Sequence, residues 1–188
     1  MRLLLHICCA PCLIYPLEKL QELGFKIDGF FYNPNIHSFL EYQNRRQAVE
    51  NYATKQAMEV IYPEYKPEEY FQAVNKKEAR GQRCEICWNM RLEKTAHYAK
   101  EKGYQAFTTT LLVSPYQDHN LLRDIGDSIA KACSIGFYYQ DFRDGFRKAQ
   151  DEARKVRFYM QKYCGCIYSE IEREKEKQDS KSKAQDAK

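Results

Sequence analysis

The segment Leu3-Leu4-Leu5-His6-Ile7, followed directly by Cys8-Cys9-Ala10-Pro11-Cys12, decides the fold of this 188-residue chain. Its apolar half shows no polar alternation, which predicts a parallel β-strand buried on both faces. Pro16 and leucines at helical spacing then predict the start of a helix that Gly24 ends. Three thiols are therefore expected on an exposed strand-to-helix turn, where open α/β sheets bind their ligands.

The rest of the chain repeats this alternation. Further strands are predicted at residues 25–32, 58–62, 106–113 and 137–140. Helices are predicted at 38–56, 118–134 and 146–162. One more helix starts at residue 67, and another continues from the Cys84–Cys87 pair through Trp88 to about residue 102. Ser38 and Glu41 have capping-box spacing, and Asp118 can cap the helix after the fourth strand. The pattern predicts the α/β class: a single-domain parallel five-stranded sheet, order 3-2-1-4-5, with helices on both faces. The first turn would then face Ser114 and Asp118.

Composition indicates one globular domain with a charged end. Hydrophobic residues make up 44% of the chain, which is enough for a sizeable core. Residues 1–169 are expected to form the α/β domain and residues 170–188 a solvated, fraying helical tail. The tail holds six acidic and six basic residues, so the net charge of +4 lies in the domain and suits a polyanionic partner.

The chain shows no run of about 18 apolar residues, so neither a membrane span nor a membrane partner is expected. The short apolar N-terminus lacks a cleavage site and indicates a strand, not a signal peptide. We therefore expect a cytoplasmic protein. In a reducing compartment, clustered cysteines indicate metal binding or catalysis more often than disulfides.

Seven of the eight cysteines fall into three clusters: Cys8, Cys9 and Cys12; Cys84 and Cys87; Cys164 and Cys166. Cys133 lies at helical spacing from apolar residues and is expected in the core. A Cys-x-x-Cys pair can reach one metal across a tight turn, and seven thiols exceed the needs of one zinc ion. They suit an iron-sulfur cluster with three or four ligands and a second metal.

Two other interpretations of the thiols remain open. One is a structural four-cysteine zinc site with three incidental thiols. The other is a redox pair at Cys84 and Cys87, although this pair precedes a long helix and does not follow the first strand. The first turn contains no glycine, so a phosphate-binding loop is not expected there.

Six motifs resemble the cobalamin-independent epoxyqueuosine reductases, the QueH family. They are His6-Ile7-Cys8-Cys9-Ala10-Pro11-Cys12, Tyr32-Asn33-Pro34-Asn35-Ile36, Arg83-Cys84-Glu85-Ile86-Cys87, Thr110-Leu111-Leu112-Val113-Ser114-Pro115-Tyr116, Asp141-Phe142-Arg143 and Tyr163-Cys164-Gly165-Cys166. They occur in order from residue 6 to about 169 and show no departure from the family pattern. Only the tail lies outside the resemblance.

The resemblance implies a reductase that converts epoxyqueuosine in the tRNA anticodon to queuosine, using a [4Fe-4S] cluster, an additional mononuclear iron and an external electron donor. It also implies a sheet like that of the adenine nucleotide alpha-hydrolases. The seven clustered cysteines become the ligand candidates for both centres. We expect Cys84 and Cys87 to bind the cluster with one thiol of the first turn, and Asp118 or Asp141 to help hold the second metal.

Epoxide reduction consumes two electrons and two protons, so proton donors are needed near the metal. Asp118, His119 and Tyr116 are candidates because they follow the fourth strand. His119 equally fits an exposed helix position.

Anticodon bases are read by stacking and by contacts to phosphate. The candidates for substrate binding are Asn33, Asn35, Ser114, Arg83, Arg143 and Trp88, with Arg45, Arg46, Arg80 and Arg91 near the same predicted edge. Each of these arginines fits a solvated helix face equally well, and Trp88 fits the core.

Two other functions compete with the reductase. A zinc-stabilised tRNA-binding module without catalysis would bind zinc and no sulfide. An iron-sulfur tRNA sulfur-transferase would need ATP, and the missing glycine-rich loop argues against it.

Overall fold

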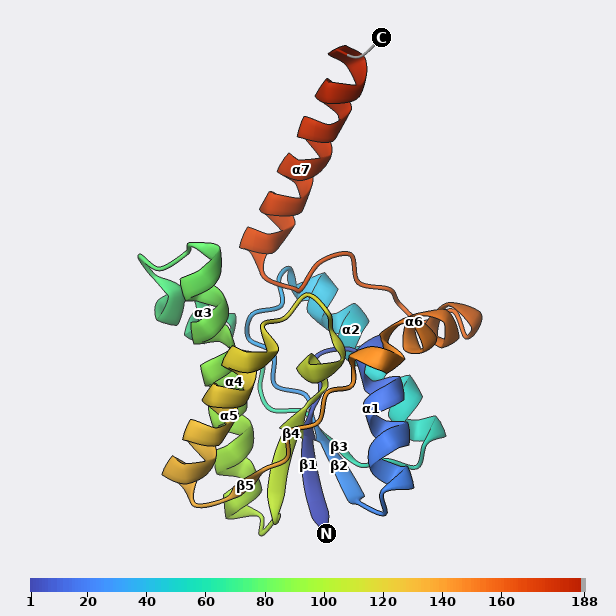
Figure 1. Ribbon diagram of the computed structural model, residues 1–188, viewed down its shortest axis with the longest axis vertical. Coiled ribbons are helices and arrows are strands. Elements are labelled where there is room, and N and C mark those ends of the chain that lie inside the picture. The colour runs from blue at the N-terminus through green and yellow to red at the C-terminus, as the bar shows by residue number, and fades with distance from the viewer. Residues whose placement is uncertain (187–188) are drawn as a thin grey trace.

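A five-stranded parallel sheet forms the centre of the computed structural model, which describes residues 1–186 (Figure 1). Its strands follow the order β3-β2-β1-β4-β5, which confirms the predicted topology. They are β1 (Arg2–His6), β2 (Lys26–Phe30), β3 (Val60–Ile61), β4 (Ala106–Thr109) and β5 (Gly136–Phe137). His6 pairs with Phe30 on one side and with Thr109 on the other, so the three central strands end level.

Helices cover both faces of the sheet (Figure 1). One face carries α1 (Ala10–Glu22), α2 (Phe39–Lys55) and α6 (Phe146–Lys155), and the other carries α4 (Arg80–Glu101) and α5 (His119–Cys133). The short helix α3 (Pro67–Val74) packs on α4, and α7 (Ile167–Asp186) projects from the domain. Single 3-10 turns, η1 (Thr110–Val113) and η2 (Arg143–Gly145), follow β4 and β5. No helix of the described residues is long and apolar enough to span a bilayer.

The burial of β1 confirms that the first apolar run forms a strand in the core. Leu3, Leu4 and Leu5 are fully buried, because helices cover successive side chains on both faces of β1. Tight packing continues beside α1, where a Cβ on Gly145 would lie 2.0 Å from the ring of Tyr15. The carboxyl ends of β1 and β4 lie beside each other, because the two strands pair up to His6 and Thr109; this is the switch point, where the strand order reverses.

Several predicted boundaries are wrong for local physical reasons. Helix α1 starts at Ala10, because the fixed φ of Pro11 suits a first helical turn, and Pro16 therefore lies inside the helix. Ser38 is at the N-cap of α2 but makes no side-chain capping bond, and the Glu41 side chain binds Arg45, so the capping box is wrong. The Asp118 cap is confirmed by a 3.0 Å bond from the Leu121 N–H.

The cysteine pair Cys84 and Cys87 lies within the first two turns of α4 and not on a tight turn before it. Residues three or four positions apart lie on the same face of a helix, so both thiols still point the same way. Cys133 is half-buried at the edge of the core, with its Sγ 3.9 Å from Nε2 of His97.

The C-terminal half of the chain, from β4 onward, differs most from the prediction. β4 ends at Thr109 where η1 begins, β5 spans two residues, and α6 ends at Lys155. Residues 156–166, here called the 156–166 segment, then run without a helix or strand to α7. The predicted tail lies within α7, which is helical through Asp186, its fraying stays a prediction, and residues 187–188 lie outside the described part. The domain boundary at residue 169 stays a prediction, and α7 crosses it.

Candidate metal centre

Three thiols lie together where β1 passes into α1. The Sγ atoms of Cys8, Cys9 and Cys12, here called the N-terminal triad, all lie within 4.8 Å of one another. Cys9 occupies the N-cap position of α1, and Cys12 lies in its first turn. The strand end and the helix start therefore bring the three side chains together without help from distant sequence.

The predicted exposure of this turn is wrong, because the 156–166 segment covers it. Cys9 and Cys12 are buried, and Cys8 is half-buried. Nε2 of Gln161 lies 2.7 Å from Sγ of Cys9 and 3.8 Å from Sγ of Cys12. Gln161 thus presents N–H donors to two sulfur atoms.

The environment of the N-terminal triad favours one thiolate. Hydrogen bonds from the Cys12 and Cys9 thiols lower the pKa of Cys8 well below its ordinary value, with a smaller contribution from the charge of Arg91. Burial raises the pKa of Cys9. The positive end of α1 adds to the stabilisation of negative charge, as at other reactive helix-start cysteines.

The turn after β1 meets the segment after β4, as the topology predicts. The contact runs through Thr110, whose Oγ1 accepts a 3.0 Å bond from the Cys8 N–H and lies 3.3 Å from the Cys8 Sγ. Ser114 and Asp118 lie further along the chain and take part in other contacts.

The four other clustered cysteines, here called the second thiol group, are Cys84 and Cys87 from α4, and Cys164 and Cys166 from the end of the 156–166 segment. Cys87 and Cys166 belong to one buried cluster with Tyr70 and Val74. The Sγ atoms of Cys164 and Cys166 are 3.8 Å apart. A hydrogen bond from Cys164 lowers the pKa of Cys166 to about 4, whereas burial raises the pKa of Cys87 to about 11.

A buried ion pair anchors the 156–166 segment. On α2, Nη2 of Arg45 lies 2.6 Å from Oε1 of Glu41, and both side chains are buried. The Arg45 guanidinium donates 3.1 Å bonds to the carbonyls of Tyr163 and Cys164. A Cβ on Gly165 would lie 3.2 Å from Nη1 of Arg45, so glycine permits this close approach.

The predicted proton donors follow β4, and among the described residues they make no hydrogen bond or ion pair with the thiols. His119 is buried, so its alternative reading as an exposed helix residue is wrong. Its Nε2 lies 3.1 Å from the Ser114 carbonyl, and its Nδ1 lies 3.8 Å from Asp141. Hydrogen bonds from Arg143 lower the pKa of Asp141 to about 2. Asp118 caps α5 and Tyr116 is exposed, and the catalytic roles of all three candidates stay predictions.

Most predicted substrate contacts lie inside the protein. The buried members are Asn33, Asn35, Arg83 and Trp88, together with Arg45 and Arg91. Arg83 binds Glu172 at 2.6 Å, and Trp88 packs in the main core. Arg46, Arg80 and Arg143 are exposed, and Ser114 is half-buried. Substrate binding by these residues stays a prediction.

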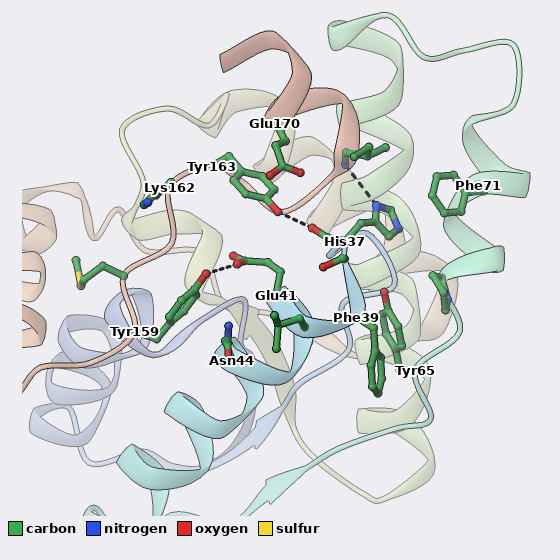
Figure 2. A pocket seen from close by; sticks show the side chains of 15 residues that line it. His37, Phe39, Glu41, Asn44, Tyr65, Phe71, Tyr159, Lys162, Tyr163 and Glu170 are labelled. Carbon is green, nitrogen blue, oxygen red and sulfur yellow. Dashed lines mark hydrogen bonds between the residues drawn. The ribbon is translucent and has the colours of Figure 1, made fainter. Parts of the chain in front are cut away.

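Sequence reasoning missed an aromatic cavity of about 660 Å³ beside the 156–166 segment (Figure 2). Its walls include Phe39, Tyr65, Phe71, Tyr159 and Tyr163. The ring of Phe71 stacks on His37 with 4.4 Å between centroids, and Tyr163 donates to the His37 carbonyl. Aromatic residues near positions 37–42 and 159–163 were the available signal, but nothing in the sequence placed them together.

The fold and the thiol clusters define a parallel α/β protein with a cysteine-rich turn where the strand order reverses. A family profile described as "Epoxyqueuosine reductase QueH" matches residues 3–172. The chain belongs to this family.

Two curated relatives support the assignment over nearly their whole lengths. The epoxyqueuosine reductase QueH of Dehalococcoides mccartyi is 40% identical over 173 residues, which cover 92% of this chain and 94% of that protein. The QueH of Thermotoga maritima is 36% identical, with 90% and 91% covered. Among solved structures, a predicted subunit of a tRNA methyltransferase from Methanocaldococcus jannaschii matches with a TM-score of 0.50 and 12% identity, over 81% of this chain and 76% of that chain. This last likeness supports the fold alone.

Proposed function

We propose that this chain is an epoxyqueuosine reductase, an oxidoreductase that converts epoxyqueuosine in a tRNA anticodon to queuosine. Family membership supports the reaction. The observation that carries the proposal is the N-terminal triad, three sulfur atoms within 4.8 Å at the switch point of the sheet. Ligands of open α/β sheets bind at this edge.

The donor set fits the proposed metals. Thiolates are the ligands of iron-sulfur clusters, which take three or four of them. The seven thiols fall into two sets on this edge, the N-terminal triad and the second thiol group, which suits a [4Fe-4S] cluster and an additional mononuclear iron. Cys87 lies in one buried cluster with Cys166, which favours ligands from the second thiol group over a pairing with a triad thiol.

Asp118 or Asp141 remains a proposed ligand of the second metal, but each carboxylate already accepts hydrogen bonds. Asp118 would give up its bond to the Leu121 N–H, and Asp141 would give up its bonds to Arg143. Thiolates are the usual ligands of iron-sulfur centres, so we propose them as the principal ligands.

The overall reaction joins the epoxide with two electrons and two protons to give an alkene and water. The bound metals would supply electrons one at a time and Lewis acidity toward the epoxide oxygen. The chain would supply protons, and His119 is the best-placed candidate because its Nδ1 faces Asp141 and has no hydrogen-bond partner within residues 1–186. An external donor would restore the electrons.

The aromatic cavity supports a single-stranded RNA substrate. Phe39 and Phe71 are 58% and 43% exposed, so both rings offer area on which an unpaired base can stack. Lys162, at the same cavity, is adjacent in sequence to Gln161, whose amide contacts the N-terminal triad. A tRNA anticodon loop bound there would lie beside the thiols.

The test is anaerobic purification, iron and sulfide analysis, and incubation with epoxyqueuosine-containing tRNA and a reductant. Nucleoside mass spectrometry should show queuosine formed with loss of the epoxide. Cys133→Ser is the matched control, because this half-buried thiol lies outside both thiol sets. Protein that holds zinc without sulfide and converts no tRNA, even after cluster reconstitution, would support the zinc-binding module instead.

A further inference from the structure

Arg91 is a buried cation between the two thiol sets. It lies on α4, one turn after Cys87, and only 4% of its surface is exposed. Its Nε lies 3.3 Å from Nε2 of His6 at the end of β1. Its Nη2 donates a 2.7 Å bond to Oδ1 of Asn33, whose own amide N–H donates to the Ile7 carbonyl. The guanidinium is therefore held against the strand end that carries the N-terminal triad.

The third contact of Arg91 is a thiol. Its Nη1 lies 3.8 Å from Sγ of Cys87, and His6, which its Nε contacts, precedes Cys8 by two residues. These contacts use three of the five N–H donors of a guanidinium. Two donors therefore remain available for sulfur acceptors of a loaded site.

Other buried arginines of the chain have acidic partners. Arg45 pairs with Glu41, and Arg83 pairs with Glu172, each at 2.6 Å. Arg91 forms no ion pair with a carboxylate in the part of the chain that the structure describes, and its acceptors are an imidazole, an amide and a thiol. A buried charge without a counter-charge is costly, so its environment is expected to supply one.

We propose that Arg91 is a positioning residue that compensates the negative charge of metal-bound thiolates in both thiol sets. This inference rests on the proposed metal centre and names the residue that balances its charge. Metal binding converts thiols to thiolates, which supplies negative counter-charge around Arg91. The fixed fork of the guanidinium, held by Asn33 and His6, aims that charge at Cys87.

The first test measures metal affinity and needs no turnover. Reduced, metal-free full-length chain is titrated anaerobically with Co²⁺, with the sulfur-to-cobalt absorption as readout. Arg91→Met should weaken Co²⁺ binding about 10- to 100-fold, the usual range for loss of a partner of the ligands. Arg91→Lys, which keeps the charge and loses the fork, should recover part of this loss. Arg154→Met removes an exposed, Asp151-paired charge and should bind Co²⁺ like the parent chain.

The second test measures the reduction potential of the reconstituted cluster by dye-mediated EPR titration. Loss of the nearby positive charge disfavours electron uptake, so Arg91→Met should shift the potential to more negative values and Arg91→Lys should shift it less. Unchanged Co²⁺ affinity and potential in folded Arg91→Met would show a packing role only and overturn the inference. Neither readout depends on queuosine formation, so a failed reductase assay and a failed Arg91 test are distinguishable.

Discussion

The N-terminal triad and the second thiol group reach the same edge of the sheet by different routes. The N-terminal triad comes from five consecutive residues on one strand-to-helix turn. The second thiol group joins α4 to the 156–166 segment, which is distant in sequence and lacks regular structure. Local backbone geometry therefore sets the first group, and tertiary docking sets the second.

The difference predicts different sensitivities. The 156–166 segment is held by Arg45, by the bond from Tyr163 to the His37 carbonyl, and by the bond from the His37 N–H to the Gly165 carbonyl. Changes to these contacts should disturb the second thiol group and leave the N-terminal triad in place. Long loops without secondary structure in compact domains are commonly functional, which suits this assignment.

The largest effect is expected from removal of one thiol in each group. Cys12→Ser and Cys166→Ser should each abolish queuosine formation, because each removes a proposed ligand. Metal and sulfide analysis should show different residual contents, since each variant leaves the other group intact. Equal, complete loss of iron in both variants would mean that the two groups hold one shared centre, and the comparison would fail.

The next effect concerns the anchor of the 156–166 segment. Glu41→Gln leaves the buried Arg45 without its counter-charge, which should cost about 3 kcal/mol of unfolding free energy in urea. Limited proteolysis should then cut within residues 156–166 while the N-terminal triad still binds metal.

Glu50→Gln is the matched control for this anchor, because Glu50 pairs with the exposed Arg46 on the same helix. Its loss should cost less than about 1 kcal/mol. If Glu41→Gln were equally mild and the segment stayed protected, docking of the 156–166 segment would not depend on this ion pair.

The two groups also show what the sequence can predict. The apolar run of β1, the thiol turn and the strand order are local or topological features, and they follow from periodicity and turn chemistry. The placement of Cys84 and Cys87 inside α4, the cover that Gln161 forms over Cys9, and the burial of Arg91 arise from tertiary packing. Arginine usually lies at the surface, so no local pattern marks Arg91 as a buried cation.

A smaller effect is expected at the aromatic cavity, whose lining includes Ile167, the residue after Cys166 of the second thiol group. Phe71→Leu keeps an apolar side chain but removes the exposed ring. Loss of one stacked base costs about 1–3 kcal/mol, so binding of an anticodon stem-loop should weaken roughly 5- to 150-fold in fluorescence anisotropy. Iron content should stay unchanged.

Leu23→Ala is the control for Phe71→Leu, because Leu23 is also exposed and apolar but lies at the end of α1, outside the cavity. It should bind the stem-loop like the parent chain. Equal affinity of Phe71→Leu and the parent chain would place the RNA on another surface, away from the second thiol group.

The smallest effect tests whether a carboxylate belongs to either group. Hydrogen bonds from Arg143 lower the folded-state pKa of Asp141 to about 2, below its ordinary value. The ionised side chain therefore stabilises the fold above about pH 4, and this contribution is lost as the pH falls toward 2. Because Asp141 is exposed, the contribution should stay below about 1 kcal/mol, and Asp141→Asn should flatten the acid limb of urea unfolding by that amount. Both thiol groups should keep their iron. Loss of iron at neutral pH would instead identify Asp141 as the predicted carboxylate ligand, and the metal centre would then extend from the thiols to the residues after β5.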